Sequence, residues 1–309
     1  MSLPAPARRV LLLKNPKSGQ GNADVDAFTA MLQTRGYEVT ERLLDDPERN
    51  AEHVRDAREY QALVVAGGDG TVSSIAYEAR EMNVPLLAFP AGTANLIAQN
   101  LNLPTTPDAL ADVLDGGNIL RTDLAELRSG DLTWGFTLMA GAGIDAAMIK
   151  DSEELKPRFG AMAYLLSALK QFTPQQVNFR LELDGKLIET RGISVMFANF
   201  GMANFRLPVA SGIDPSDGRL AVIVLKGLTP LSLLPTLIDS VRSRLNLGDP
   251  MFEDRLELYE CREATLMADQ QLPLQYDGEL QDAALPASVR VLPGAARFLT
   301  QGTHEDLTT

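Results

Sequence analysis

The sequence has very little of the chemistry that several common enzyme classes need. It contains one cysteine, Cys261, and two histidines, His53 and His304. A single cysteine cannot form a disulfide within the chain, which fits a reducing compartment such as the cytoplasm. Both histidines lie in charged or polar stretches that are typical of a solvated surface. We therefore expect neither a serine-histidine-aspartate hydrolase nor a histidine-ligated zinc enzyme.

Positive charge and long apolar runs are also scarce. The chain has 28 lysines and arginines against 41 aspartates and glutamates, a net charge of -13. Such a chain repels nucleic acid and has no general attraction to anionic lipid, so membrane contact has to be local. No apolar run approaches the roughly 20 residues that cross a bilayer, and the first residues lack a signal-peptide pattern. We expect a cytoplasmic protein that contacts a membrane peripherally.

The first third of the 309 residues alternates between strand and helix patterns. The expected strands are Val10 to Asn15, Tyr37 to Leu44, Ala62 to Ala66 and Pro85 to Phe89. The expected helices are Asp24 to Arg35, Pro47 to Tyr60, Thr71 to Met82 and Thr93 to Asn100. This alternation predicts a parallel sheet that is covered on both faces and binds ligands beyond the carboxyl ends of its strands. Residues 1–122 are therefore expected to form an α/β domain.

Strand patterns dominate after about Thr122, and Asp-Gly turns separate many of them. The expected strands are Asp123 to Arg128, Leu132 to Met139, Val177 to Leu183, Leu187 to Asn199, Leu220 to Leu225, Glu257 to Met267, Leu272 to Tyr276 and Ser288 to Leu292. Two apolar helices, Phe159 to Phe172 and Leu231 to Leu245, interrupt the strands. We expect residues 123–309 to form a mostly antiparallel β domain, with about the last 15 residues packed back on the first domain.

Three glycine-containing turns follow three strands of the first domain. They are Asn15-Pro16-Lys17-Ser18-Gly19, Gly67-Gly68-Asp69-Gly70-Thr71 and Pro90-Ala91-Gly92-Thr93-Ala94-Asn95. Glycine lets backbone N–H groups approach phosphate oxygens, and a helix that begins just afterwards adds its positive end. One such turn alone is more typical of a tight connection, whereas three at one sheet edge indicate a phosphate site. None of them is a Walker A loop or a dinucleotide-binding turn.

The polar residues of these turns suit a nucleotide. Thr71 and Thr93 can cap helices or donate to phosphate, and Lys17 and Ser18 add a cation and a hydroxyl. Asp69 suits a ribose hydroxyl, a backbone N–H or a metal-bound water, because its charge repels phosphate.

Two acidic turns in the second half complete the chemistry of a phosphate transfer. One is Asp214-Pro215-Ser216-Asp217-Gly218-Arg219, and the other is Asp277-Gly278-Glu279. Phosphoryl transfer needs Mg²⁺ to neutralise phosphate and a carboxylate to accept the proton of the acceptor. Taken alone, each turn is more often a simple hairpin connection, for which Asp-Gly is the usual sequence.

Together these motifs resemble the bacterial lipid kinase family related to the diacylglycerol kinase catalytic domain, in the family's order and over nearly the whole chain. Sphingosine, ceramide and NAD kinases are more distant relatives. The block Gly141-Ala142-Gly143-Ile144-Asp145 also matches. The resemblance implies an NAD kinase/diacylglycerol kinase-like α/β domain, a β-rich second domain, and an ATP site at the three glycine turns. It implies that Asp217, with the backbone around Asp214 and Arg219, binds Mg²⁺, and that Asp277 or Glu279 is the general base.

The sequence departs from the family pattern at two places. Many members have an aspartate where this chain has Leu96, directly after the Asn95 of the third glycine turn. A family threonine at the end of the second strand is replaced by Leu43 or Leu44. Acceptor specificity and ATP affinity are the properties that these changes affect.

The leading hypothesis is a Mg²⁺-dependent lipid kinase that moves the γ-phosphate of ATP to a lipid hydroxyl, such as that of diacylglycerol, at a membrane surface. One alternative is a kinase of a soluble acceptor, in the manner of NAD kinase. Another is a nucleotide- or lipid-binding protein with weak catalysis, which Leu96 favours and the two carboxylates of the Asp277 turn oppose. The sequence leaves the acceptor and the oligomeric state open, a homodimer included.

Overall fold

A computed structural model of the chain describes residues 8–18, 22–143, 176–200, 213–226, 256–281 and 283–302. The helices are α1 (Asn22–Thr34), η1 (Pro47–Arg49), α2 (Asn50–Val54), η2 (Ala57–Glu59), α3 (Asp69–Glu78), α4 (Leu96–Asn100) and α5 (Pro107–Gly116), of which η1 and η2 are 3-10 helices. The strands are β1 (Arg8–Lys14), β2 (Tyr37–Leu43), β3 (Ala62–Gly67), β4 (Leu86–Pro90), β5 (Asn118–Ser129), β6 (Leu132–Phe136), β7 (Met139–Gly143), β8 (Val177–Leu183), β9 (Lys186–Gly192), β10 (Ser194–Ala198), β11 (Leu220–Leu225), β12 (Leu256–Cys261), β13 (Glu263–Ala268), β14 (Leu274–Tyr276), β15 (Glu279–Gln281) and β16 (Ala287–Thr300).

The N-terminal part of the chain is an α/β unit built on four parallel strands in the order β2-β1-β3-β4. The whole of β3 is buried, as is the Val10 to Leu13 part of β1. Continuous apolar runs of this kind form the central strands of a parallel sheet with helices on its faces. Helix α1 contacts α5, and α3 contacts α2 and α4. The predicted parallel α/β fold is confirmed.

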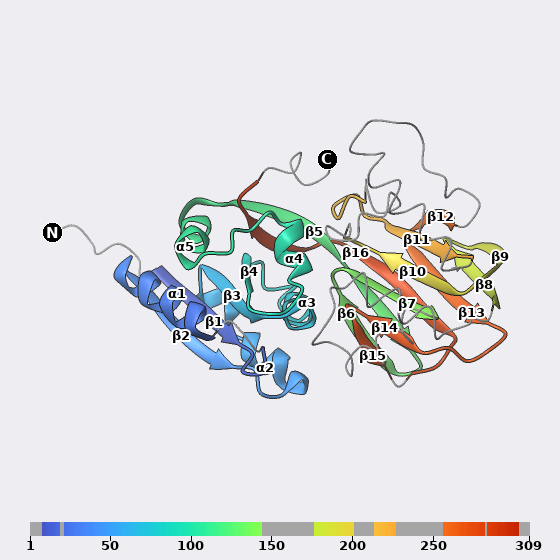
Figure 1. The fold of residues 1–309 in the computed structure, drawn as a ribbon, viewed down its shortest axis with the longest axis horizontal. Helices are drawn as coiled ribbons and strands as arrows, with labels where there is room; N and C mark the ends of the chain where they lie inside the picture. The colour runs from blue at the N-terminus through green and yellow to red at the C-terminus, as the bar shows by residue number, and fades with distance from the viewer. Residues whose placement is uncertain are drawn as a thin grey trace, which may run out of the picture.

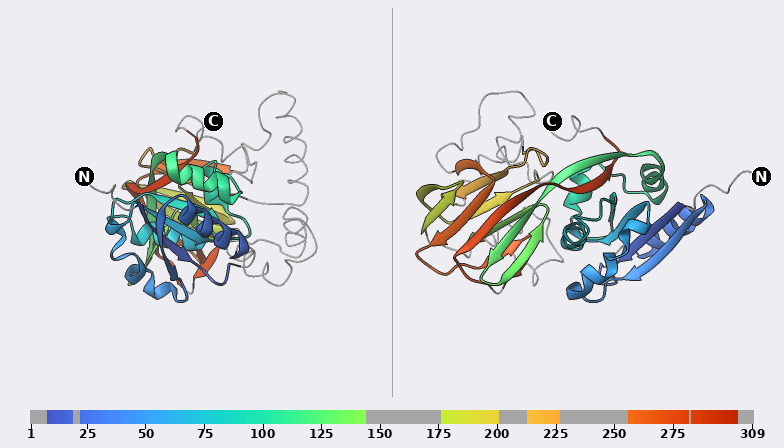
Figure 2. Two further views of the ribbon diagram at one scale, coloured as in Figure 1. Left: turned by 90° about the vertical axis from the view of Figure 1, so that its left-hand side faces the viewer. Right: turned by 180° about the vertical axis from the view of Figure 1, so that it is seen from behind.

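Two long antiparallel strands, β5 and β16, connect this unit to the second one. They pair from Ser288 opposite Arg128 to Thr300 opposite Asn118, with a register shift between Leu292 and Ala296. Figures 1 and 2 show both strands running from the β-rich part of the molecule into the α/β part. The far end of β16 pairs in parallel with β4 through Phe298, which is fully buried in the first core. One ten-stranded sheet therefore runs through both units.

The second unit is a sandwich of antiparallel sheets. One layer is the β5, β6, β8, β9, β13 and β16 part of the long sheet, and the other has the order β12-β11-β10-β7-β14-β15. Strand β8 alternates strictly between buried and exposed residues, as expected when one face of a sheet packs on a core. The second core joins Leu181 and Leu266 of one layer to Phe197 and Val222 of the other. The predicted antiparallel β domain is confirmed.

Several element predictions differ from the structure. The helix expected over Pro47 to Tyr60 is replaced by η1, α2 and η2, and within these three elements only Asn50, Val54 and Ala57 are buried. Such a sparse apolar face does not hold a continuous helix against a core. The strand expected over Leu187 to Asn199 divides at Gly192 into β9 and β10, which belong to different sheets. A Cβ on Gly192 would lie 2.7 Å from the carbonyl oxygen of Leu225, so glycine permits the crossing.

Other strands also divide, and two elements were not anticipated. The strand expected over Leu132 to Met139 ends early, because β6 stops at Phe136, and a separate strand, β7, begins at Met139. Glu257 to Met267 divides into β12 and β13. Helix α5 and the short strand β15 were missing from the sequence prediction. The apolar helices expected over Phe159 to Phe172 and Leu231 to Leu245 lie outside the described residues.

Candidate active site

The turn after β3 joins that strand directly to helix α3. Gly68 precedes the helix in an extended conformation, and the helix begins at Asp69 rather than at Thr71. A Cβ on Gly67 would lie 2.7 Å from the Cβ of Thr71, so glycine is needed for so tight a turn. The free N–H groups and the positive end of α3 consequently lie at the carboxyl end of β3, an arrangement that binds anions.

The turn after β4 lies against the turn after β3. Asn95 closes this second turn, because its Oδ1 accepts a hydrogen bond from the Gly92 N–H at 2.8 Å and its Nδ2 donates to the Gly92 carbonyl at 2.9 Å. A Cβ on Gly92 would lie 2.5 Å from the Cα of Gly68, so the two turns meet backbone to backbone. Thr93 is exposed beside this contact, where its hydroxyl can reach a ligand.

Asp69 links the helices that follow these two turns. Its Oδ1 accepts a hydrogen bond from the N–H of Ile97 at 2.8 Å, in the first turn of α4. The sequence suggested three partners for this carboxylate, and the structure contains one of them, the backbone N–H. A carboxylate at a helix start is favourable because it satisfies a free N–H and balances the positive end of the helix. Leu96, the departure from the family pattern, packs against the first core.

The turn after β1 is the remaining glycine turn at this edge of the sheet. Asn15 donates a hydrogen bond through Nδ2 to Thr71 Oγ1 at 2.8 Å, so it is tied to the first turn of α3. The Asn15 side chain also accepts from the Lys17 N–H at 2.9 Å, and the Asn15 carbonyl accepts from the Ser18 N–H at 3.2 Å. Pro16 and Lys17 are exposed. The three glycine turns thus meet at one edge of the sheet, although Gly19 lies outside the described residues.

The turn between β14 and β15 brings two carboxylates to the same edge. Asp277 and Gly278 have φ angles of 45° and 85°, the two positive values that a tight hairpin turn requires. The Asp277 side chain is buried and accepts four hydrogen bonds. The backbone N–H groups of Thr137, Leu138 and Met139 donate at 2.9 Å each, and the fourth donor is the hydroxyl of Ser73 on α3.

These contacts make Asp277 an anchor between the two units. Burial raises the pKa of Asp277 to about 6, although the hydrogen bonds from Ser73 and the three backbone N–H groups oppose that rise. With both oxygens occupied, this carboxylate has little freedom to approach a substrate. The geometry of Asp277 instead fixes the Asp277–Glu279 turn against helix α3.

Glu279 has the opposite environment. Its side chain is exposed, and it reaches so far toward the glycine loop that a Cβ on Gly70 would lie 2.5 Å from Glu279 Oε1. Protein atoms crowd around the carboxylate, and this partial desolvation raises its pKa above the usual value of 4.5. A carboxylate with a raised pKa beside an anion-binding loop is suited to take a proton from a hydroxyl that attacks a phosphate.

The other acidic turn lies between β10 and β11, and a buried carboxylate that the sequence prediction missed supports it. Asp123 on β5 accepts hydrogen bonds from the N–H groups of Gly218 and Gly294 at 2.7 Å each. Its own N–H donates to the carbonyl of Pro215 at 2.6 Å. The only signal in the sequence was an acidic residue inside an apolar strand pattern. Such a position predicts a buried, hydrogen-bonded carboxylate and does not show which loop it holds.

This turn carries carboxylate and carbonyl oxygens, which are the types of ligand that a hard divalent cation prefers. Burial, followed by the negative charges of Asp214, Asp123 and Glu260, raises the pKa of Asp217, and a cation would relieve that repulsion. Asp217 Oδ1 accepts the Arg219 N–H at 2.8 Å, while the Arg219 side chain lies 3.6 Å from Glu260. Within the described ranges, three or more acidic, histidine or cysteine side chains nowhere gather closely enough to hold a metal. A metal here would need backbone carbonyls as well as side chains.

No helix among the described residues is long and apolar enough to cross a membrane. A groove of about 260 Å³ on the outer face of the β sandwich lies between Glu126 and Asp184 and does not include the glycine turns.

Known proteins resemble this chain over almost its full length. A diacylglycerol kinase of Mycobacterium tuberculosis is 29% identical over 92% of this chain and 94% of its own. A diacylglycerol kinase of Staphylococcus carnosus is 25% identical over 91% of each chain. Two solved structures from Bacillus anthracis str. Sterne share the fold, with TM-scores of 0.74 and 0.67 at 19% and 17% identity, and each comparison covers 95% of this chain and 97% of the other.

Two family models account for both units of the fold. The diacylglycerol kinase catalytic domain matches residues 9–127, and the YegS C-terminal NAD kinase beta sandwich-like domain matches residues 139–300. The first match includes all three glycine turns, and the second includes both acidic turns. The chain therefore belongs to the lipid kinase family that joins a diacylglycerol kinase catalytic domain to this β sandwich.

Proposed function

We propose that this protein is an ATP-dependent lipid kinase that transfers the γ-phosphate to a hydroxyl of a lipid such as diacylglycerol. One observation carries the proposal most directly, the position of the Glu279 carboxylate beside Gly70 at the start of α3. A proton acceptor and a phosphate-binding loop meet there, although they lie more than 200 positions apart in the sequence. The similar proteins described as diacylglycerol kinases support a lipid as the acceptor.

In this proposal the glycine turns bind and orient the nucleotide. Backbone N–H groups from the Gly67 and Gly92 turns approach the phosphates, and the positive end of α3 stabilises their charge. Thr93 and Lys17 are exposed at the same edge and contribute a hydroxyl and a cation. Asp69 keeps α3 and α4 at a fixed separation through its bond to the Ile97 N–H. Catalysis then depends mainly on positioning and on charge neutralisation.

Glu279 is proposed as the general base, and Asp277 as the residue that fixes its turn. Glu279 is accessible and has a raised pKa, whereas both oxygens of Asp277 are already engaged. A bound Mg²⁺ would supply positive charge to the nucleotide phosphates. A second Mg²⁺ is proposed at the turn that contains Asp217, where carboxylate and carbonyl oxygens would hold it. Asp123 would keep this turn in place through its hydrogen bond from the Gly218 N–H.

The acceptor requires the protein to reach a bilayer surface. We propose a peripheral contact made by apolar side chains, because a net charge of -13 gives no general attraction to anionic lipid. Leu96 leaves the acceptor side of the site without the carboxylate that many family members have, so the lipid is proposed to be selected by other contacts.

Radiolabelled ATP and a panel of lipids in mixed micelles test this function. Wild-type protein should label a lipid hydroxyl in the presence of Mg²⁺, and Glu279→Gln and Asp69→Ala should abolish or strongly reduce the labelling. A parallel arm offers NAD without micelles. Labelled NAD and unlabelled lipids would instead indicate a kinase of a soluble acceptor. ATP binding without transfer to any acceptor would indicate a binding protein and would overturn the proposal.

A further inference from the structure

Helix α3 contacts the β sandwich through two polar side chains that lie one turn apart. Ser73 donates to Asp277, as described above, and the hydroxyl of Tyr77 donates to Glu126 Oε1 at 2.7 Å. Residues at positions i and i+4 share one face of a helix. The face that begins at Gly70, beside Glu279, therefore continues along α3 as a row of contacts with the second unit.

The ring of Tyr77 lies directly on the backbone of β6. A Cβ on Gly135 would lie 2.0 Å from Cγ of Tyr77, so any other residue at this position would displace the ring. The Arg80 guanidinium lies over the same ring, 4.0 Å from its centre. Burial, together with the hydrogen bond to Glu126, raises the pKa of Tyr77 to about 12, so the hydroxyl stays protonated and keeps donating.

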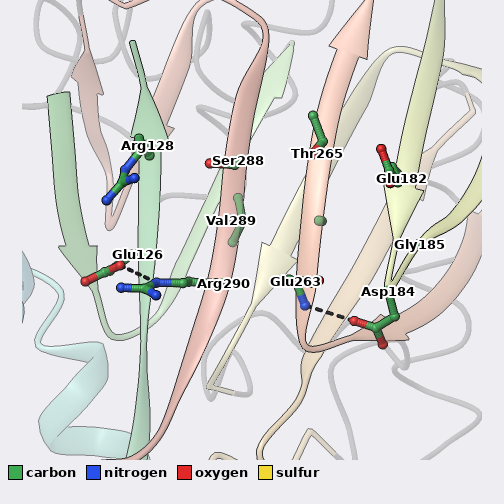
Figure 3. Close-up of a pocket in the computed structure, with 11 residues that line it drawn as sticks. Glu126, Arg128, Glu182, Asp184, Gly185, Glu263, Thr265, Ser288, Val289 and Arg290 are labelled. Atoms are coloured by element: carbon green, nitrogen blue, oxygen red, sulfur yellow. Dashed lines mark hydrogen bonds and ion pairs between the residues drawn. The ribbon is translucent and has the colours of Figure 1, made fainter. Parts of the chain in front are cut away.

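Glu126 connects Tyr77 to the long strand β16. The Glu126 side chain is 8% exposed, and its Oε2 accepts a hydrogen bond from Arg290 Nε at 2.6 Å. Figure 3 shows this pair on neighbouring strands at the edge of the outer groove. Burial opposes ionisation of the carboxyl, but Arg290 and Tyr77 together hold its pKa below the usual value. The bridge of Tyr77, Glu126 and Arg290 thus joins the helix of the glycine loop to both β5 and β16.

We propose that Tyr77 and Glu126 are positioning residues for phosphoryl transfer, because they fix the direction of α3 relative to the Asp277–Glu279 turn. Ser73 is one polar contact between α3 and the Asp277–Glu279 turn, and one contact does not fix the angle between the helix and the β sandwich. A second anchor four residues, or about 6 Å, along the axis removes this freedom. The proposal rests on the proposed function, since the distance that it fixes is the one between the phosphate-binding loop and the general base Glu279.

The experiment compares two tyrosine hydroxyls with the same chemistry in different places. Tyr77→Phe removes the bond to Glu126. Tyr37→Phe is the matched control, because the Tyr37 hydroxyl also donates to a carboxylate, that of Asp115 at 2.9 Å, and burial also raises its pKa to about 12. Tyr37 begins β2, the edge strand of the sheet, away from the second unit. The variants, together with Glu126→Gln and the Tyr77→Phe/Glu126→Gln double variant, are assayed for kcat and for the KM of ATP.

We expect Tyr77→Phe to lower kcat by roughly 10- to 100-fold, as small misplacements of reacting groups do, and to leave the KM of ATP within about twofold. Tyr37→Phe should leave both constants unchanged. The double variant should lose no more than the worse single variant, because the two groups act as one unit. Equal kcat values for Tyr77→Phe and Tyr37→Phe would overturn the proposal, as would losses that multiply in the double variant.

Hydrogen exchange of the backbone gives a readout that does not need activity. Tyr77→Phe should speed exchange in two peptides at once, the one that covers α3 and the one that covers the Asp277–Glu279 turn, whereas Tyr37→Phe should change neither. If the wild type transfers phosphate to no acceptor, the proposed function fails and this measurement still decides the positioning role. Unchanged exchange in Tyr77→Phe would then refute it.

Discussion

The two acidic turns of the β sandwich look alike in sequence but are supported in different ways. In the Asp277–Glu279 turn, the aspartate is buried and holds the turn against α3, while the glutamate reaches the glycine loop. In the Asp214–Arg219 turn, the buried support comes from Asp123 on a distant strand, and Asp217 is itself exposed. The first turn therefore joins two units of the fold, whereas the second is held by the long β5 and β16 strands.

This contrast separates carboxylates that hold a turn in place from carboxylates that remain more exposed. Asp277 and Asp123 each have both oxygens bonded to backbone N–H groups, and Asp277 has Ser73 in addition. The Glu279 and Asp217 residues are exposed, yet neighbouring protein atoms partly desolvate each carboxylate and raise its pKa above the usual value. Moving a carboxylate that accepts several hydrogen bonds is costly, because its donors would lose their partner. A solvent-accessible carboxylate with a raised pKa can instead exchange a proton or bind a cation.

The largest effect should come from substituting, one at a time, the two carboxylates of the Asp277–Glu279 turn. Glu279→Gln should lower kcat by about 10² to 10⁴-fold, the usual contribution of a general base, with no change in Tm. Asp277→Asn should lower Tm as well as kcat, because its amide cannot accept from the buried N–H groups on both sides. Thermal unfolding and lipid phosphorylation, measured on the same preparations, check this difference.

ATP binding by both variants serves as the control for the first prediction. Titration calorimetry should find the affinity largely intact in Glu279→Gln, whose side chain is not proposed to hold the nucleotide. A fully active Glu279→Gln variant would show that the base lies elsewhere. An Asp277→Asn variant with unchanged Tm would show that the buried hydrogen bonds do not anchor the turn.

The next largest effect concerns the glycine that faces Glu279. Gly70→Ala should reduce kcat by roughly 10- to 100-fold, because its Cβ would lie 2.5 Å from Glu279 Oε1 and would displace the carboxylate. Gly68→Ala is the control, since its Cβ would meet only the Cα of Gly92 at an ordinary 3.9 Å. Initial rates with saturating ATP distinguish the two. Equal losses in both variants would mean that the loop tolerates no side chain, whatever Glu279 does.

Sequence patterns were sufficient for the glycine turns but not for this division of roles. The turns follow buried strands, and carboxyl ends of parallel strands must meet at one edge, so Gly67 and Gly92 could be placed together without coordinates. Asp277 and Glu279 are two positions apart in one hairpin, and no periodicity distinguishes them. Their roles depend on Ser73 and Gly70, which approach only after the two units pack.

Asp123 and Tyr77 are two residues that sequence patterns did not single out. Each side chain works through a partner far along the sequence, Asp123 through Gly218 and Gly294, and Tyr77 through Glu126. A single sequence gives no local signal for such pairs, because they follow from how distant elements pack together and not from any motif.

A smaller effect is expected at the second turn. Asp123→Asn should lower the free energy of unfolding by about 1–3 kcal/mol, because one buried N–H would face an amide NH₂ group. Under the proposal of a Mg²⁺ site beside Asp217, it should also reduce the stabilisation that added Mg²⁺ gives to the wild type. Urea unfolding with and without Mg²⁺ measures both quantities.

Asp184→Asn is the matched control for that measurement. One oxygen of Asp184 accepts the N–H groups of Arg262 and Glu263 at 2.9 and 3.0 Å, and an asparagine carbonyl can accept both. This variant should keep the wild-type stability and the wild-type response to Mg²⁺. A Mg²⁺ response that is unaffected in Asp123→Asn would remove the support for a metal at this turn.

The smallest expected effect is on pH dependence in the Asp277–Glu279 turn. Acidification should lower the activity that depends on Glu279, and it should raise the stability that depends on Asp277. Desolvation raises the pKa of Glu279 above 4.5, so kcat/KM should fall on acidification at a higher pH than an ordinary glutamate would give. Burial raises the pKa of Asp277 from 3.8 to about 6, which means that folding favours its protonated form. The pH-dependent part of its contribution to stability is therefore complete below pH 3.8 and is lost as the pH rises through about 6. The hydrogen bonds that Asp277→Asn would break contribute to stability separately from this part.

Activity and the Asp277 contribution to stability should accordingly move in opposite directions between about pH 4 and pH 7. Rate profiles of the wild type and urea unfolding of the wild type and Asp277→Asn across this range test the pair of signs. The asparagine variant should lose the part of the pH dependence of unfolding that comes from Asp277. If both quantities rose together and the variant kept the wild-type slope, Asp277 would be ionised throughout, and the backbone N–H groups would outweigh its burial.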